Sequence, residues 1–578
     1  MIIDFLDRSS PDLVEVDVCV VGAGPAGLAI AREFIGTRTR LCVVESGGPS
    51  AEESPQQLCE GNSVGPLEFH PAISRLRAFG GTGNVWGGGS LPLTSLDLTA
   101  RDWVPHSGWP ISQEELQPYY DSAAIVCGVG SHTFAHGSST TKPLVPPLPL
   151  DDGIVENKFF ATSGLKFGAR YREELSNASG VTVLLHATVL ELVPNESVTA
   201  LHTARIVGAD GRQGTLKARY FVIAAGGIEN ARLLLLSDSV ATAGLGNDRG
   251  LVGRFFMDHP RGLIGKLTLA DTTFVARPYD RTLYEGDSPS FAEISLTEAA
   301  QREHRILASR VHPFEAGFIT VPRGIQALRA LRGRWQKRFG DPPTLQERIH
   351  AAMRINVPKE SEPPYSEAAI PALLWNTMRG SGDIVAGLTN RLLGRRALKS
   401  RWVDLVGYFE QSPNPDSRIT LGSDTDRLGQ RRVQIDWRLT ALDRLTHRKA
   451  AALFGESLSR VSGGRFEPAP WLTSPESTSP PLQGTAHHIG TTRMATSPLD
   501  GVVDRDCRVH GIDNLFVAGS SVFPTGGWVF PTLTIVALSL RIAQTIKLAL
   551  ADRTPPALVA RGAATSRAAA ESVAPAPF

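Results

Sequence analysis

The sequence predicts a two-lobed α/β fold, and three observations carry this prediction. The chain has 578 residues, and single hydrophobic cores stop growing at about 250–300 residues, so at least two lobes are expected. Near the N-terminus, an apolar run, a glycine-rich turn, a helical run and a second apolar run follow one another. This is the order of a βαβ unit. Residues from about 260 to 480 abandon that order and contain strand-like pieces typical of a mixed or antiparallel sheet.

The first βαβ unit is predicted by three adjoining segments. Residues 14–24, VEVDVCVVGAG, are almost filled by apolar residues, as in a strand buried on both faces of a parallel sheet. The following PAGLAIAREF has helical spacing, and residues 41–48, LCVVESGG, form a second buried strand. Residues 50 to about 150 are rich in Gly, Pro and Ser, which is typical of a covering or functional segment.

The rest of the chain alternates between strand and helix signals. Residues 181–193 predict a second strand-rich stretch, and Asp210-Gly211 between two alternating runs predicts a hairpin. The strand YFVIAAGG leads into the helical run IENARLLLLS, and RGLIGKLTLA and SRITL predict strands of the second lobe. Near the C-terminus, NLFVAGSS predicts a strand and residues 532–550 a long helix. The tail, residues 553–578, is biased toward Ala and Pro and is predicted to be disordered.

Composition excludes several classes of protein. Hydrophobic residues make up 42%, charged residues 20%, and the formal net charge is +1, so no nucleic-acid partner is indicated. The five cysteines form no CxxC pair; no metal site is predicted, and a reducing compartment is favoured. No basic segment followed by an apolar run opens the chain, and no uncharged apolar run approaches about 18 residues. We therefore expect a cytoplasmic protein without a transmembrane segment, with an oligomer possible.

A dinucleotide site is predicted at the first strand–helix turn. Gly22, Gly24 and Gly27 fit the GxGxxG pattern, in which the glycines permit a tight turn, backbone approach to a pyrophosphate and close helix–strand packing. The helix N-terminus offers free N–H groups to phosphates. Glu45 ends the next strand at about the 20-residue spacing of an acid that binds a ribose hydroxyl. This acid favours FAD or NAD over NADP.

Three further motifs indicate a particular family of dinucleotide-binding proteins. They are RAFGGTGNVWGGG (77–89), AAGGIENARLLLLS (224–237), and the long run from GTAHHIGTTRM to FPTLTIVALSLRIA near the C-terminus. With the GxGxxG motif, they make the chain resemble the glucose–methanol–choline (GMC) oxidoreductases, which are FAD enzymes. The resemblance is greatest to the branch that contains pyranose oxidase and bacterial sugar dehydrogenases. It extends from about Val16 to Leu550, with a gap in a basic helical insertion.

The resemblance implies a domain arrangement and a cofactor site. Residues 14–257 and 481–552 would form a discontinuous Rossmann-like FAD-binding domain, and residues 258–480 a sheet-based substrate domain with a helical insertion at about 322–400. Some relatives attach FAD through a histidine in the glycine-rich loop; Val85 stands there in this chain, so FAD is predicted to be non-covalent. The residues implied to bind FAD are Gly22, Gly24, Ala26, Gly27, Glu45, Gly80, Gly81, Gly83, Asn84, Val85, Trp86, Val189, Ala225, Gly226, Gly519, Ser520 and Thr532.

The resemblance also implies a reaction and a catalytic base. A hydroxyl group of a sugar, glycoside or polyol would be oxidised by hydride transfer to flavin N5, with electrons passed to an unknown acceptor. A histidine suits removal of the hydroxyl proton, and in HHIGTTRM the family's base falls on His487. His488 is adjacent, but the spacing to Gly490-Thr491 favours His487. The helix after Pro531 would direct its N-terminus toward the flavin, where it stabilises negative charge.

One position departs from the family. Where a second catalytic Asn or His is usual, this chain has Phe530, which offers no hydrogen bond. His487 could act alone, or with His488 or the Glu410-Gln411 pair. Alternatively, Phe530 and Trp528 shape an apolar or stacking pocket, with Gln411 and Trp528 as substrate contacts.

Two rival functions remain open. One is an FAD-dependent natural-product tailoring enzyme that performs a dehydrogenation or rearrangement in an apolar pocket. The other is a flavoprotein without catalysis.

Two further segments have alternative interpretations. Residues 322–339, PRGIQALRALRGRWQKRF, contain six basic residues and no acid. They could contact an anionic membrane, a partner or an anionic substrate, or form the solvated face of an inserted helix. Asp258-His259-Pro260 resembles a family segment at the junction of the FAD site and the substrate lobe. His259 is predicted to be structural there.

Overall fold

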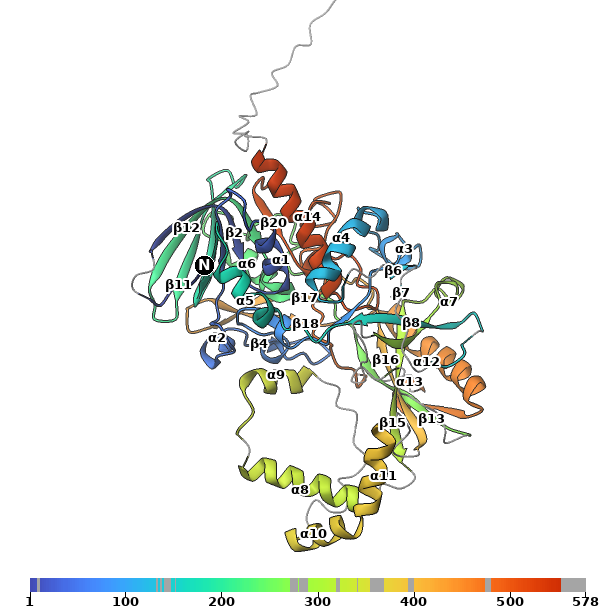
Figure 1. The fold of residues 1–578 in the computed structure, drawn as a ribbon. Coiled ribbons are helices and arrows are strands. Elements are labelled where there is room, and N and C mark those ends of the chain that lie inside the picture. The colour runs from blue at the N-terminus through green and yellow to red at the C-terminus, as the bar shows by residue number, and fades with distance from the viewer. Residues whose placement is uncertain are drawn as a thin grey trace, which may run out of the picture.

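The protein combines two large β-sheets with helices in a mixed α/β architecture (Figure 1). The computed structural model describes residues 1–7, 11–130, 134–135, 138–139, 147–150, 152–270, 279, 290–318, 323–339, 341–353, 368–392, 400–473 and 480–551. The predicted tail, residues 553–578, lies outside this part of the chain.

The first sheet has eight strands and contains the predicted βαβ unit. Its order is β1-β9-β3-β2-β12-β11-β10, and β20 also pairs with β12. The pairs β1/β9, β9/β3, β3/β2, β2/β12 and β12/β20 are parallel, whereas β10, β11 and β12 are antiparallel. The strands are β1 (Ile2–Asp4), β2 (Leu13–Val21), β3 (Leu41–Val44), β9 (Val181–Leu185), β10 (Ala187–Pro194), β11 (Leu201–Gly208), β12 (Gln213–Ile223) and β20 (Leu515–Val517).

Two local predictions in this sheet are confirmed. The hairpin at Asp210-Gly211 is confirmed, because it joins antiparallel β11 and β12 and Gly211 has φ 87°. The strand-rich stretch predicted over residues 181–193 is also confirmed, and it consists of the two strands β9 and β10. The chain breaks at His186, whose φ is 54°, so β9 pairs with β3 while β10 turns to pair with β11. Contacts of the His186 ring with Asp4 and Glu52 hold this break.

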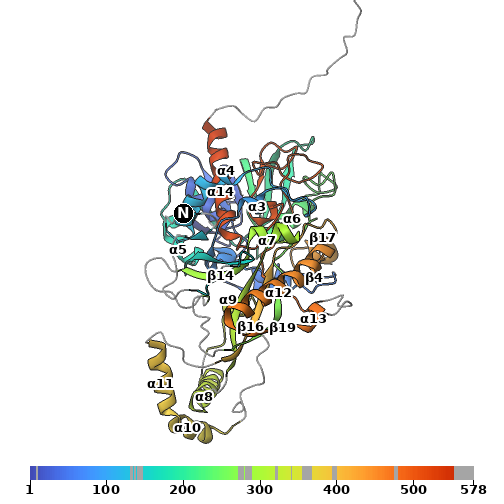
Figure 2. The same cartoon turned by 90° about the vertical axis from the view of Figure 1, so that its right-hand side faces the viewer.

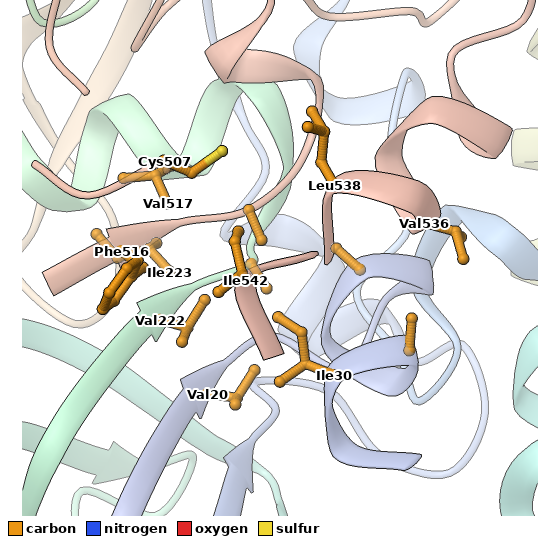
Figure 3. Close-up of a cluster of buried hydrophobic side chains, with 14 of the residues drawn as sticks. Val20, Ile30, Val222, Ile223, Cys507, Phe516, Val517, Val536, Leu538 and Ile542 are labelled. Atoms are coloured by element: carbon orange, nitrogen blue, oxygen red, sulfur yellow. The ribbon is translucent and has the colours of Figure 1, made fainter. Parts of the chain in front are cut away.

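Helices α1 (Pro25–Glu33) and α14 (Thr532–Ala551) cover one face of the first sheet. Figure 3 shows Val20 and Val222 of the sheet beside Ile30 of α1 and Ile542 of α14 in this core. Within the described residues, α14 is the one helix long and apolar enough to cross a membrane, but 56% of that stretch is buried inside the protein. Its packing against α1 and α4 (Gln113–Val126) is that of a core helix.

The second sheet confirms a sheet-based second lobe. Its seven strands have the order β19-β13-β16-β15-β14-β8-β5, and α12 (Ala441–Ser462) shares a buried apolar cluster with them. Strands β5 and β8 come from the segment that was assigned to the FAD-binding domain, so the domain limits stay a prediction. The strands are β5 (Gly89–Ser90), β8 (Val155–Thr162), β13 (Arg261–Thr268), β14 (Ser290–Leu296), β15 (Ser309–Phe318), β16 (Ser400–Phe409) and β19 (Arg465–Pro468).

The SRITL segment belongs to neither large sheet. It forms β17 (Arg418–Thr425), which pairs with β18 (Arg431–Asp436), and β18 pairs with β4 (Gly61–Ser63). Its prediction as a strand is confirmed, but its placement in the second sheet is wrong. The reason is burial, since Ile419 packs with Ile228 and Phe69 of the first lobe.

The basic insertion is helical, as predicted. Helices α8 (Arg323–Phe339), α10 (Ile370–Arg379) and α11 (Ser381–Leu392) lie together, away from both sheets, in Figures 1 and 2. Helix α9 (Leu345–Met353) instead returns to the first lobe, where Ile349 packs against Leu76 and Val85. The other α-helices are α2 (Glu53–Gln57), α3 (Ser95–Leu98), α5 (Phe167–Ser176), α6 (Gly226–Leu236), α7 (Glu298–His304) and α13 (Pro470–Thr473).

Candidate active site

A cavity of ≈ 800 Å³ joins the two lobes. Its walls include residues that directly follow β2, β3 and β12 of the first sheet, and others from β15 and β16 of the second. Ligands of open parallel sheets bind beyond the carboxyl ends of the strands. The N-terminus of α14 also reaches this cavity, with Thr532 in its wall, and a helix N-terminus favours negative charge.

The glycine turn leaves space for a phosphate-bearing ligand. Gly24 lines the cavity, and a Cβ built there would meet no atom within 4 Å. Gly22 has φ 106°, which favours glycine. A Cβ on Gly27 would lie 1.9 Å from the Gly22 carbonyl oxygen, so Gly27 permits helix and turn to touch. The three glycines therefore have the space, backbone angle and close contact that the three tasks of the motif require.

Glu45 is held at the edge of this space by two backbone groups. Its carboxylate accepts the Ala23 N–H at 2.9 Å and the Gly47 N–H at 2.8 Å. Burial raises the pKa of Glu45, and these two hydrogen bonds oppose the rise. Each carboxylate oxygen has capacity for a second donor, so the group fits the ribose hydroxyls of a dinucleotide such as FAD.

An arginine cluster in the cavity wall was missed by the sequence reasoning. Glu229 accepts hydrogen bonds from Arg75 at 2.7 Å and Arg77 at 2.6 Å. Burial would raise the pKa of Glu229, but Arg77, Arg232 and Arg75 together lower it to about 2. Both Arg75 and Arg77 line the cavity. The signal that could have found Arg77 is its place at the start of the RAFGGTGNVWGGG motif.

Most predicted cofactor residues come together in this wall. Gly27, Gly80 and Asn84 do not line it; Asn84 instead donates to the Phe79 carbonyl and accepts the Gly168 N–H, which fixes the loop. The residues that do line it are Gly22, Gly24, Ala26, Glu45, Gly81, Gly83, Val85, Trp86, Val189, Ala225, Gly226, Gly519, Ser520 and Thr532.

His487 lines the cavity with one ring nitrogen already engaged. Its Nδ1 lies 2.9 Å from Thr485 Oγ1 and 2.9 Å from Nδ1 of His259. Burial lowers the pKa of His487 well below its usual range, and the nearby His259 and Arg310 act in the same direction. An imidazole that stays neutral with one nitrogen engaged can accept a proton at the other nitrogen.

His488 lies in more apolar surroundings. Its ring contacts Phe69, with ring centroids 5.4 Å apart, and Phe256 at 6.3 Å. Burial lowers its pKa to about 3, with a smaller contribution from Arg75. His488 also lines the cavity, but no hydrogen bond of the described residues reaches its Nε2.

The partners that the sequence suggested for His487 are engaged elsewhere. Glu410 binds Arg101 at 2.9 Å and accepts the Ala308 N–H, and Gln411 accepts the Trp437 indole N–H. Gln411 and Trp528 are buried behind the cavity wall and do not line it. Phe530 does line it, with its ring 5.6 Å from that of His487.

Other residues of the cavity wall are aromatic or basic. Trp86, Phe314, Tyr408 and Phe530 supply aromatic surface there. The described lining residues also include Arg261, His312, His350 and Met353, and their carboxylates are Glu45 and Glu229 alone. These residues of β13, β15, β16 and α9 had no local motif, because sheet register brings them to the cavity. No described residue of α8 lines it, so the anionic-substrate interpretation of that basic segment gains no support.

Comparison with known proteins agrees with this geometry. Residues 413–539 match the family model of the GMC oxidoreductases. The chain is 35% identical to 6'''-hydroxyparomomycin C oxidase of Streptomyces lividus over 95% of this chain and 94% of that protein. It is 24% identical to the fructose dehydrogenase large subunit of Gluconobacter japonicus, over 84% and 71%. A crystal structure of formate oxidase shares the fold, with a TM-score of 0.57 and 16% identity over 94% and 100%.

Proposed function

Because this chain belongs to the GMC oxidoreductase family and is an FAD-dependent oxidoreductase acting on CH–OH donors, we propose that it oxidises a hydroxyl group of a sugar, glycoside or polyol. The observation that carries the proposal is His487, which stands in the cavity wall with Nδ1 engaged by Thr485 and His259. His487 accepts the hydroxyl proton of the substrate. When bound, FAD supplies the acceptor for the hydride that leaves the carbinol carbon.

The fixed charges of the cavity wall narrow the choice of substrate. Arg75, Arg77 and Arg261 line the cavity, and the carboxylate of Glu229 is already engaged by Arg75 and Arg77. A polycationic aminoglycoside would need free carboxylates to offset its charge. We therefore favour a neutral or carboxylate-bearing sugar or glycoside, with the aromatic wall packed against the C–H faces of the ring. The substrate that we propose therefore differs from the aminoglycoside in the name of the Streptomyces lividus relative.

FAD is proposed to be non-covalent. The position at which some relatives carry a linking histidine is Val85, which lines the cavity and packs against Ile349. Flavin that leaves the protein on acid precipitation supports this proposal. Flavin that stays with the pellet overturns it.

The test is anaerobic loss of the oxidised flavin absorbance in the purified holoenzyme. Neutral sugars, glycosides, uronic acids, simple polyols and paromomycin-type aminoglycosides are added in turn. Bleaching by neutral or acidic sugars supports the proposal, whereas bleaching by aminoglycosides alone overturns the charge argument. His487→Ala is expected to lower the flavin reduction rate about 10²–10⁴-fold, the usual contribution of a general base. His488→Ala serves as the neighbouring comparison, and a larger loss there would transfer the base role to His488.

A second candidate rests on Phe530. Its ring belongs to an apolar cluster with Phe160 and Trp528, and it stands where a polar residue is usual in the family. This favours a bulky apolar substrate, processed in natural-product tailoring by dehydrogenation or rearrangement. Flavin that no member of the carbohydrate panel bleaches, but that apolar secondary alcohols do bleach, supports this candidate.

A further inference from the structure

A buried carboxylate organises the loop that carries His487. Asp258 accepts backbone N–H groups of His259 at 2.7 Å, Thr485 at 3.0 Å, Ala486 at 3.1 Å and His487 at 3.1 Å. It also accepts the Thr485 hydroxyl at 2.7 Å. Ala486 has φ 62°, uncommon for alanine, so the loop closes tightly around this acid. Every one of these partners donates, which requires an acceptor and favours the ionised carboxylate.

The hydroxyl group of Thr485 decides which atom donates in the hydrogen bond between Thr485 and His487. A threonine hydroxyl carries one hydrogen, and here the Asp258 carboxylate takes it. Thr485 Oγ1 is therefore an acceptor toward Nδ1 of His487, 2.9 Å away. It follows that His487 carries its hydrogen on Nδ1 and leaves Nε2 with a free lone pair.

His259 completes the arrangement. Its Nδ1 lies 2.9 Å from Nδ1 of His487. Because Nδ1 of His487 carries a hydrogen, Nδ1 of His259 presents a lone pair to it, and the neutral His259 ring then carries its own hydrogen on Nε2. We propose that His259 is a positioning residue which, with Thr485, holds His487 in the Nδ1–H tautomer and makes Nε2 the basic atom at the cavity. The inference rests on the proposed role of His487.

This arrangement supplies a partner for His487 without the residue that Phe530 replaces. When Nε2 takes the substrate proton, the Nδ1–H of the cation donates to two acceptors, with the negative Asp258 behind Thr485. Burial and the cations Arg310 and Arg261 disfavour the positive charge on His487, whereas the nearby His488 stays neutral. His259 does not line the cavity, so it acts through His487 rather than on the substrate.

The test compares His259→Leu, which removes the acceptor, with His259→Asn, whose amide oxygen can occupy the place of Nδ1. His259→Leu is expected to slow flavin reduction of the holoenzyme about 10²-fold, as a misplaced catalytic group does. Positive charge on His259 would lower the pKa of His487, but His259 itself has a pKa of about 4 and is neutral above that pH, where its Nδ1 stabilises the His487 imidazolium as an acceptor. Removing this acceptor should move the acidic limb of the pH profile to lower pH. His259→Asn should recover most of the rate. His447→Leu is the matched control, since His447 is another buried histidine, packed against Phe409 away from the cavity.

A second readout does not use activity. In holoenzyme with ¹⁵N-labelled histidine, the His487 signals are identified by their loss in His487→Ala, and they should report hydrogen on Nδ1. If His259→Leu does not fold, Thr485→Val tests the same tautomer from the other acceptor. Hydrogen on Nε2, or equal rates and pH profiles in His259→Leu and the wild type, overturns the inference. A rate that does not depend on His487 overturns the proposed function instead.

Discussion

Among single residues, Glu45 has a structural role and a proposed role in binding FAD. Its two oxygens tie the glycine turn to the strand end through Ala23 and Gly47. Glu45→Gln places an amide NH₂ against one of these N–H donors and removes the charge. FAD affinity should fall about 10–100-fold, because hydrogen bonds to a charged group contribute about 1.5–3 kcal/mol. Titration of the apoprotein with FAD, followed by flavin fluorescence, measures this loss.

The exposed acid Glu68, whose side chain is 79% exposed, provides the control for this prediction. Glu68→Gln should leave FAD affinity unchanged. If Glu45→Gln binds FAD as tightly as the wild type, Glu45 does not contact the cofactor and its role is confined to the turn.

Phe530 provides no hydrogen bond to the neighbouring His487, so other residues must supply one. The Arg310 guanidinium lies 3.6 Å from the Tyr408 ring centroid and 5.0 Å from that of Phe530, and it pairs with Glu293 at 2.8 Å. The aromatic ring thus joins a cation and an apolar cluster beside His487. The hydrogen-bond partners of His487 are then Thr485 and His259 rather than the residue at position 530.

At the scale of elements, the turn between β2 and α1 separates two kinds of glycine. Gly24 has φ −79°, which an alanine also adopts, and its Cβ would enter the cavity without touching the protein. Gly24→Ala should therefore keep the thermal midpoint of the apoprotein but weaken FAD by about 1–3 kcal/mol, the usual cost of overpacking. Gly27→Ala should instead lower the apoprotein midpoint, because its Cβ would strike the Gly22 carbonyl.

Gly164→Ala is the matched control for this pair. A Cβ there also meets no atom within 4 Å, but Gly164 does not line the cavity. It should change neither the midpoint nor FAD binding. An apoprotein midpoint that falls as far in Gly24→Ala as in Gly27→Ala would contradict the distinction.

For the whole molecule, buried neutral histidines predict sensitivity to acid. Burial lowers the pKa of His259 to about 4 and those of His447 and His488 to about 3, below the ordinary 6.5. The unfolded chain therefore binds more protons below pH 6.5. The stability of the fold is full above that pH and falls as the pH drops toward 4, by about 1.4 kcal/mol per pH unit for each histidine.

Thermal unfolding of the holoenzyme between pH 8 and pH 4 tests this expectation. The midpoint should be constant near pH 7–8 and fall below pH 6.5, and His447→Leu should make the fall shallower by removing one of the buried histidines that take up a proton on unfolding. A midpoint that stays level from pH 7 to pH 5 would contradict it.

The elements predicted from sequence succeeded where the signal was local. The GxGxxG turn, the Asp210-Gly211 hairpin and the long C-terminal helix each depend on a few adjacent residues, and each is present. The strand-rich stretch over residues 181–193 is present, but its division into β9 and β10 at His186 was not predicted, because His186 contacts Asp4 and Glu52, which lie far away in the chain. The SRITL strand pairs with β18 rather than with the second sheet for a similar reason, because its apolar side chain is buried against residues that lie far away in the chain.

The sequence by itself determined the α/β class and the use of FAD, and it predicted the FAD-binding residues and the histidine of the HHIGTTRM motif. Backbone turns and the predicted cofactor contacts of this kind involve contiguous residues, so a short sequence pattern is enough to predict them. Only the tertiary structure placed Arg261, His312 and Tyr408 in one cavity and set His259 against His487, 228 positions apart. Such contacts depend on how antiparallel strands pair and how the two lobes pack, and that long-range geometry leaves no pattern among neighbouring residues.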